Sequence, residues 1–200
     1  MYGILLYDGV EPIDVGATFG VLSLARRIAP DLEFGGIART PGEVACASGM
    51  RIIADYGIDE PPASLSDLII TGGPGWIDVV KDERMLEFVR STRARKSAIC
   101  TGAMILEAAG VLAGKRATTK QEVFLGETSP LDILASRMRT EASAVVDDQG
   151  IVTSGGVTLG IDAMFYCLAR SHGQDVASEV ARVMEYTRAL EANKSALGYT

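Results

Sequence analysis

Cys100 has the clearest chemical potential in this sequence. It follows a short apolar run, Ser97–Ile99, and precedes helix-forming residues that end near Gly110. A strand that turns at once into a helix pushes the turn residue out of the core and aims unpaired N–H groups at it. Both effects favour the thiolate, the nucleophilic form of cysteine. The pattern therefore predicts a nucleophile elbow, with cysteine where hydrolases have serine.

An inert cysteine fits the same spacing. A free cysteine after an apolar strand is commonly a small buried hydrophobic residue with no chemical role. Thr101 and Gly102 keep the predicted turn small, which suits both interpretations. The spacing alone leaves the two open.

A carboxyl group near this cysteine would add acid–base chemistry. Asp14 and Glu11 both follow the first predicted strand. A carboxyl buried beside a thiolate should have a raised pKa, through desolvation and like-charge repulsion, and could then donate a proton. Asp14 could instead be the N-cap of the next helix, a common role for aspartate.

Composition excludes several other classes of site. The 200 residues carry a net charge of −7, which argues against binding a nucleic-acid backbone or an anionic membrane. The three cysteines, Cys46, Cys100 and Cys167, form no C-x-x-C pair, and His172 is the only histidine. We therefore expect no metal, no cofactor and no disulfide framework, and a reducing cytoplasm is the default location. Gly72–Gly75 lacks the Lys-Ser/Thr of a phosphate-binding loop.

Strands alternate with helices along the chain, and several strands end in glycine-rich turns. Such alternation predicts one α/β domain over residues 1–200, a three-layer sandwich whose mostly parallel sheet has helices on both faces. We expect a small hairpin at Val44–Ala47 and Arg51–Ala54, a short helix from Pro130, and a loose tail at Asn193–Thr200. The main strands are expected at Tyr2–Tyr7, Leu32–Ala38, Leu65–Thr71, Ser97–Ile99, Arg116–Thr119 and Ile151–Ser154, and the main helices at Asp14–Ala29, Glu83–Arg95, Ala103–Ala109, Thr158–Ser171 and Gln174–Tyr186.

Ligands of open parallel sheets gather beyond the carboxyl ends of the strands. Four such ends carry polar or glycine-rich residues, so the fold should bring them together. They are Asp8 to Asp14, Gly72 to Gly75, Cys100-Thr101 and Ser154 to Gly156.

Four segments resemble the ThiJ/PfpI superfamily. They read YDGVEPID at Tyr7–Asp14, TGGPG at Thr71–Gly75, AICTGA at Ala98–Ala103 and TSGGVTLGID at Thr153–Asp162. The resemblance covers nearly the whole chain in the right order. It implies the flavodoxin-like fold of class I glutamine amidotransferases and, because relatives are commonly dimers, a homodimer.

Within that superfamily the sequence is most similar to isonitrile hydratases and to the amidotransferase-like half of AraC-type regulators. By motif position, the resemblance makes Asp14 the acid beside Cys100, with Thr101 the residue after the nucleophile. It also implies that Gly72 and Gly73 help to form an oxyanion-type pocket. Glu11 remains the rival acid.

The sequence departs from this branch in two places. Lys120 stands where the branch often has histidine, so a Cys-His dyad is not available there, and a solvated surface lysine is the plain alternative. Ala17-Thr18 replaces a common Gly-Pro, which weakens any transfer of substrate specificity. We interpret His172 as a surface or capping residue.

Three hypotheses follow. The first is a cysteine-dependent hydratase or hydrolase of a small molecule, with isonitrile hydration as the specific reaction. The second is a non-catalytic sensor in which Cys100 is oxidised reversibly. The third is the ligand-binding module of a regulator; such regulators carry a helix-turn-helix pair, whereas about one helix is expected here after the core. Proteolysis would need a histidine near the cysteine, and none is expected there.

Overall fold

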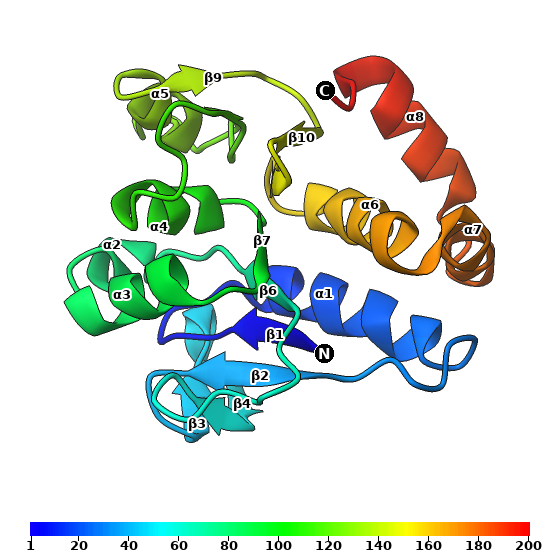
Figure 1. The fold of residues 1–200 in the computed structure, drawn as a ribbon. Helices are drawn as coiled ribbons and strands as arrows, with labels where there is room; N and C mark the ends of the chain where they lie inside the picture. The colour runs from blue at the N-terminus through cyan, green and yellow to red at the C-terminus, as the bar shows by residue number, and fades with distance from the viewer.

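A seven-stranded sheet forms the middle layer of the protein in the computed structural model, which describes residues 1–200 (Figure 1). The strands run in the order β10-β11-β7-β6-β1-β2-β5, and all neighbours are parallel except β10 and β11. Their bounds are β1 Tyr2–Leu5, β2 Phe34–Ala38, β5 Tyr56–Gly57, β6 Asp67–Ile70, β7 Arg95–Ala98, β10 Val145–Asp148 and β11 Ile151–Ser154.

Helices cover both faces of this sheet, so the predicted three-layer α/β fold is confirmed (Figure 1). One layer holds α1 (Pro12–Ala25), α6 (Leu159–His172) and α7 (Gln174–Val183), which pack together. The opposite layer holds α2 (Trp76–Val79), α3 (Glu83–Ser91) and α4 (Gly102–Ala108). The remaining elements are α5 (Pro130–Ala135), α8 (Thr187–Leu197), the 3₁₀ turn η1 (Ala47–Gly49) and the pairs β3 (Gly42–Ala45) with β4 (Arg51–Ala54) and β8 (Arg116–Ala117) with β9 (Arg139–Thr140).

Local sequence explains the main elements. All four residues of β1 and of β6 are buried, as expected for central parallel strands covered on both faces. The N-cap of α3 is Asp82, whose carboxylate accepts hydrogen bonds from the N–H groups of Arg84 and Met85. The resulting core is one cluster of 48 buried residues, which holds the strand ends in fixed positions. No helix has the length and apolar character needed to cross a membrane.

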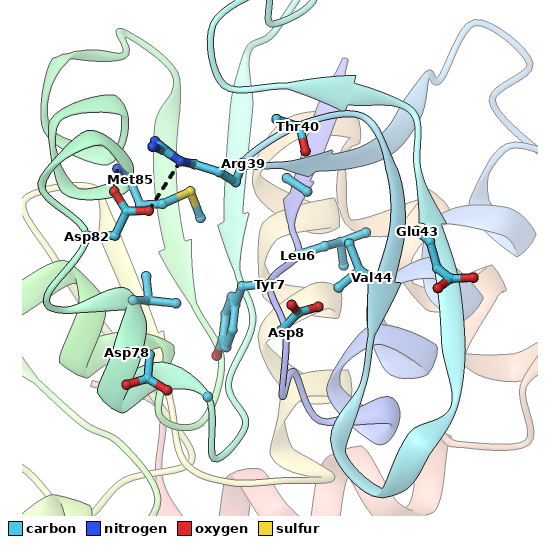
Figure 2. Close-up of a pocket in the computed structure, with 13 residues that line it drawn as sticks. Leu6, Tyr7, Asp8, Arg39, Thr40, Glu43, Val44, Asp78, Asp82 and Met85 are labelled. Carbon is cyan, nitrogen blue, oxygen red and sulfur yellow. Dashed lines mark hydrogen bonds and ion pairs between the residues drawn. The ribbon is translucent and has the colours of Figure 1, made fainter.

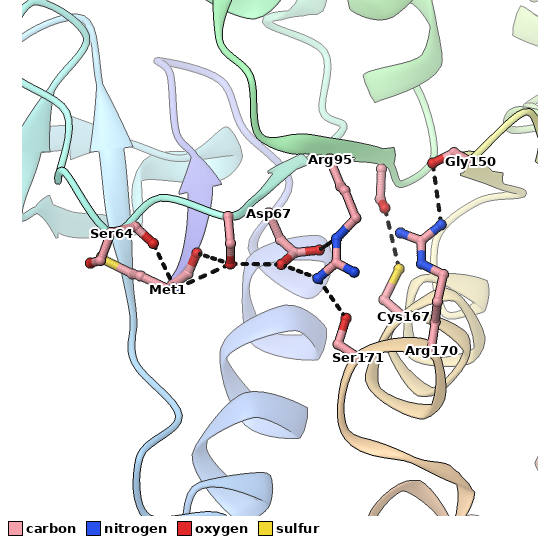
Figure 3. A network of polar contacts seen from close by, with 10 residues as sticks. Met1, Ser64, Asp67, Arg95, Gly150, Cys167, Arg170 and Ser171 are labelled. Atoms are coloured by element: carbon pink, nitrogen blue, oxygen red, sulfur yellow. Dashed lines mark hydrogen bonds and ion pairs between the residues drawn. The ribbon is translucent and has the colours of Figure 1, made fainter.

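A polar network fastens the amino ends of the strands (Figure 3). Asp67 accepts two hydrogen bonds from Arg95, at 2.9 and 2.8 Å, and Arg95 also binds Ser171 at the end of α6. His172 stacks on Tyr2 at 5.9 Å at this same edge. These residues are therefore at the edge of the sheet opposite the predicted site, and the interpretation of His172 as uninvolved in that site agrees with its position.

The prediction of a loose C-terminal tail is wrong. Residues 187–197 form α8, and Tyr199 bridges to Val145 of the edge strand β10. The Thr200 N–H donates to the Val145 carbonyl at 3.0 Å, and its own carbonyl accepts from the Asp147 N–H at 2.7 Å. The buried carboxylate of Asp162 fastens this segment through side chains distant in sequence, which no local pattern could reveal.

Candidate active site

Cys100 stands at a sharp turn between β7 and α4. Its φ of +54° is a left-handed conformation that a non-glycine residue adopts only when the surroundings enforce it. The Thr119 hydroxyl donates a 2.7 Å hydrogen bond to the Cys100 carbonyl, which fixes the turn from the other side. The predicted nucleophile elbow is therefore present.

Asp14 reaches this turn from the first turn of α1. Its side chain is fully buried, and Oδ2 accepts a 2.8 Å hydrogen bond from the Gly72 N–H. A Cβ placed on Gly72 would lie 2.7 Å from Asp14 Oδ2 and 2.8 Å from the Cys100 Cβ. The absence of a side chain at Gly72 thus lets the acid and the cysteine meet. The other carboxyl oxygen of Asp14, Oδ1, is buried and has no hydrogen-bond partner.

Burial controls the protonation of both groups. It raises the pKa of Asp14 to about 7, against the hydrogen bond from Gly72, which lowers it. Burial, followed by the nearby Asp14 carboxylate, raises the pKa of Cys100 to about 12, while the Thr101 N–H and hydroxyl act in the opposite direction. Near neutral pH, Asp14 therefore exchanges its proton readily and the sulfur is a thiol.

The sequence-based expectation of an exposed, ionised cysteine needs correction. Cys100 is only 3% exposed, and its surroundings disfavour rather than favour the thiolate. The amino end of α4 does point toward the turn, but desolvation outweighs it. Ionisation of the sulfur in this site has to be coupled to another change, such as proton uptake by Asp14 or the approach of a positive charge.

The three remaining residues of the predicted site, Thr101, Gly72 and Gly73, also lie at this turn, but their backbone N–H groups already donate hydrogen bonds. The Gly72 N–H binds Asp14, and the Gly73 N–H donates to Thr101 Oγ1 at 2.9 Å. The Thr101 N–H is the amide that hydrogen-bonds to the Cys100 sulfur and lowers its pKa. A role for Gly72 and Gly73 in binding an oxyanion stays a prediction, and it would require these hydrogen bonds to exchange.

Glu11 has a different position from Asp14. It is the N-cap of α1, where its carboxylate accepts from the Ile13 N–H at 3.4 Å, and it is only partly buried. The alternative in which Asp14 caps the helix is therefore wrong, because Glu11 has that role. Of the two acids, Asp14 is the one beside the Cys100 side chain.

Two side chains at the site were missed in the sequence. The Tyr7 hydroxyl donates to the Thr71 carbonyl at 2.9 Å, and burial followed by the charges of Asp14 and Cys100 raises the Tyr7 pKa well above its usual range. Thr119 holds the Cys100 carbonyl. Each is the last residue of a predicted strand and lies just beyond the observed one, β1 or β8, which is the only signal that could have found them.

Lys120 is not the solvated surface residue of the plain alternative. It is partly buried, and a Cβ placed on Gly156 would meet both the Lys120 stem and the Cys100 sulfur. Its positive charge lowers the pKa of both Asp14 and Cys100. The chain thus has one cation beside its cysteine and acid.

A cavity of about 380 Å³ adjoins this site without including Cys100 (Figure 2). Tyr7 lines the cavity, while its hydroxyl is bonded to Thr71 on the side of the site. The cavity walls carry the acids Asp8, Glu43, Asp78 and Asp82 and one cation, Arg39, which pairs with Asp82 at 3.3 Å. Tyr7 therefore separates the cavity from the cysteine.

The other cysteines have structural surroundings. Cys46 and Cys167 are buried and unpaired, and the Cys167 sulfur is 3.2 Å from the Ser97 hydroxyl within the core. No group of three or more histidine, cysteine or acidic side chains is arranged to hold a metal ion.

Comparison with known proteins agrees with the fold. A model of the DJ-1/PfpI family matches residues 3–170. The chain is 30% identical to an isonitrile hydratase of Pseudomonas putida over 190 residues, which cover 94% of this chain and 78% of the relative. It is also 25% identical to the HTH-type transcriptional regulator GbdR of Pseudomonas aeruginosa over 93% of this chain, but it spans only half the length of that regulator.

The solved structures give the same fold. A ThiJ/PfpI family protein from Pseudomonas syringae superimposes with a TM-score of 0.79 at 24% identity, covering 92% of this chain and 74% of the other. At that identity the likeness supports the architecture and leaves the chemistry to the residues around Cys100.

Proposed function

This chain belongs to the DJ-1/PfpI family, and from that premise we propose that it is a cysteine-dependent hydratase or hydrolase of a small molecule. The specific reaction we propose is hydration of an isonitrile to an N-substituted formamide. The observation that carries the proposal is the buried pair of Cys100 and Asp14, in which Asp14 keeps one oxygen without a partner. The relationship to the Pseudomonas putida isonitrile hydratase supports the choice of substrate.

The pair can supply both chemical steps. The Cys100 thiol first passes its proton to the Asp14 carboxylate. The resulting thiolate attacks the terminal isonitrile carbon, and the Asp14 carboxylic acid donates the proton to that carbon, which gives a thioimidate, R–N=CH–S–Cys. Asp14, now ionised, takes a proton from water as the water attacks the same carbon. Loss of the thiolate leaves R–NH–CHO, because the second water proton ends on nitrogen. Both groups return to their starting forms.

The electrostatics of the site suit this cycle. A carboxyl whose pKa is about 7 can act as an acid in the first step and as a base in the second near neutral pH. Enclosure of the sulfur favours a narrow reactant, since Cys100 is 3% exposed. An isonitrile presents its reactive carbon at the tip of a linear group and so fits this constraint. Thr101, whose N–H acts on the sulfur, would stabilise negative charge as the thiolate departs.

The test is isonitrile consumption by the wild type and by substituted chains. For the wild type we expect loss of the isonitrile infrared band and formation of the formamide. For Cys100→Ala and Cys100→Ser we expect turnover at least about 1,000-fold slower than that of the wild type. Cys167→Ala is the matched control, because it removes another buried thiol outside the site, and it should retain activity. No turnover by the wild type of any isonitrile in a panel, or full activity of Cys100→Ser, would reject the hydratase.

A cysteine-oxidation sensor is the second candidate. The enclosed sulfur would admit hydrogen peroxide as readily as a narrow substrate, although the raised pKa of the thiol acts against oxidation. Mass spectrometry after mild peroxide treatment separates the two functions: a sulfenic or sulfinic adduct on Cys100 in a chain without turnover favours the sensor. The relationship to GbdR supports a third candidate, a ligand-binding module that would bind small molecules without consuming them.

We also propose that the chain works as one domain in a cytoplasmic homodimer. Its three unpaired thiols suit a reducing compartment. Light scattering at micromolar concentration should give twice the mass of the chain; a monomer would contradict the dimer.

A further inference from the structure

The position of Lys120 is fixed by backbone contacts. Thr118 donates its N–H to Thr153 Oγ1 at 2.9 Å, and the Thr119 hydroxyl binds the Cys100 carbonyl. The Lys120 carbonyl accepts from the Leu131 N–H at 3.0 Å, beside the start of α5. The segment is therefore held to the elbow, to β11 and to α5, and the Lys120 side chain starts from a defined point.

That point lies beside the sulfur. A Cβ placed on Gly156 would be 2.9 Å from both Cβ and Cγ of Lys120 and 3.0 Å from the Cys100 Sγ. The lysine stem and the sulfur thus flank the same glycine, which leaves no side chain between them. Any larger residue at Gly156 would separate them.

The ammonium group has no partner within the chain. Lys120 takes part in none of the ion pairs, whereas most of the arginines do. Its charge lowers the pKa of both Asp14 and Cys100, so the ammonium can stabilise a negative charge on either group.

The other titratable groups that act on Cys100 or on its partner Asp14 are all acids. Asp14 approaches from α1 and Tyr7 from beyond the end of β1, while Glu11, the N-cap of α1, acts on Asp14. With these groups alone, transfer of the thiol proton to Asp14 would place a thiolate in a buried site without any cation. Lys120 is the one positive side chain that acts on both Cys100 and Asp14.

We propose that Lys120 is the counter-ion of the Cys100 thiolate, a positioning residue that makes the reactive form of the sulfur accessible near neutral pH. In the step it assists, the thiol proton passes to the Asp14 carboxylate, which gives a thiolate, a neutral carboxylic acid and the Lys120 ammonium. The net charge of the three groups is zero before and after the transfer. The ammonium stabilises the state in which the negative charge lies on sulfur.

This inference rests on Cys100 being the nucleophile of the proposed function, but its test needs no natural substrate. The probe is iodoacetamide, a neutral reagent that alkylates thiolates, and the rate of alkylation of the Cys100 peptide is measured by mass spectrometry from pH 6 to pH 9. Lys120→Met and Lys120→Gln remove the charge, and Lys120→Arg keeps it. Lys115→Met is the matched control, a partly buried lysine of the same connection that also forms no ion pair.

We expect Lys120→Met and Lys120→Gln to slow alkylation of Cys100 about tenfold at each pH, because loss of the ammonium raises the pKa of the thiol by about one unit. Lys120→Arg should stay within a few-fold of the wild type, and Lys115→Met should match it. Thermal unfolding of each variant shows whether it is folded. A wild-type rate of alkylation in folded Lys120→Met or Lys120→Gln would overturn the inference, as would an Lys120→Arg variant slowed as much as Lys120→Met.

The two proposals fail in different ways. A wild type that consumes no isonitrile, together with slower alkylation of Cys100 in Lys120→Met, rejects isonitrile hydration and supports the counter-ion. Normal isonitrile turnover by the wild type, together with unchanged alkylation in Lys120→Met, supports isonitrile hydration and rejects the counter-ion.

Discussion

Two aspartates of this chain are fully buried and yet have opposite surroundings. Asp162, in α6, accepts hydrogen bonds from the hydroxyls of Tyr186 and Tyr199, at 2.8 and 2.9 Å, and from the Asn193 side chain. Both of its oxygens have partners. Asp14 accepts a hydrogen bond from the Gly72 N–H and lies beside the Cys100 thiol, and its oxygen Oδ1 has no partner. Burial raises the pKa of both carboxyl groups.

The difference separates a structural acid from a reactive one. An unsatisfied buried oxygen costs stability and is tolerated where chemistry needs it, whereas a fully satisfied carboxylate fixes its donors in place. Asp162 thereby holds α8 and the C-terminal residues on the protein. Asp14 is left able to gain and lose a proton beside Cys100. Substitution of Asp14 should therefore mainly reduce activity, and substitution of Asp162 should mainly reduce stability.

The largest effect should be on activity, in Asp14→Asn. Asparagine can still accept from the Gly72 N–H, but it cannot donate and recover a proton. We expect turnover in the proposed reaction to fall about 1,000-fold, with the folded structure retained. Turnover and circular dichroism measured on the same preparation check this, and Asp162→Asn is the comparison. Activity within a few-fold of the wild type would show that Asp14 is not the acid.

The same variant should change how stability depends on pH. The pKa of Asp14 is about 7 in the folded protein against 3.8 as its ordinary value, so the folded state keeps a proton that the unfolded chain releases. The free energy of unfolding therefore falls as pH rises from about 4 to about 7, by up to roughly 4 kcal/mol from this group.

Asp14→Asn should lack that decrease, since it has no proton to release. Urea unfolding at pH 4.5, 6 and 7.5 measures the difference between the two chains, in which the contribution of Asp162 cancels. We expect the free energy of unfolding of the variant to increase relative to that of the wild type as pH rises. A constant difference would mean that Asp14 titrates alike in the folded and unfolded chains.

Asp162→Ala should mainly destabilise the protein. It leaves partly buried donors from Tyr186, Tyr199 and Asn193 without their acceptor, so we expect a loss of about 3 kcal/mol in the free energy of unfolding. Chemical denaturation gives the number, and hydrogen exchange should show α8 opening first. An unchanged unfolding midpoint would remove the structural half of the comparison.

The smallest effect should come from Tyr186→Phe, which removes one of the hydroxyls bound to Asp162. We expect a loss of about 1 kcal/mol with normal turnover. Arg188→Ala, on the same helix, is a matched control that removes no contact to Asp162. Loss of activity in Tyr186→Phe would connect the two sites and weaken their separation.

The fold was predictable because its signals are local. Buried strands such as β1 and β6 are short apolar runs, and the turn at Cys100 follows directly from a strand that meets helix-forming residues. The four glycine-rich or polar strand ends then follow from the parallel arrangement alone. Element bounds differed by a few residues, as with α1, which begins at Pro12 because Glu11 caps it.

Properties that depend on tertiary packing were not predictable. The direction of the Cys100 pKa shift depends on how deeply the sulfur is enclosed, which spacing does not contain. The position of Lys120 beside Gly156 depends on contacts between segments about 35 residues apart. The docking of α8 depends on one carboxylate in α6, and neither helix shows it in its own sequence pattern.

The C-terminal residues also shape the way in which the protein can associate with itself. Tyr199 and Thr200 occupy hydrogen-bonding groups of β10, so this border of the sheet offers few free donors and acceptors to another chain. At the opposite border, β5 has only two residues. Both borders thus resist strand-by-strand growth into larger aggregates. A second copy would have to join through helices or loops rather than by extending the sheet.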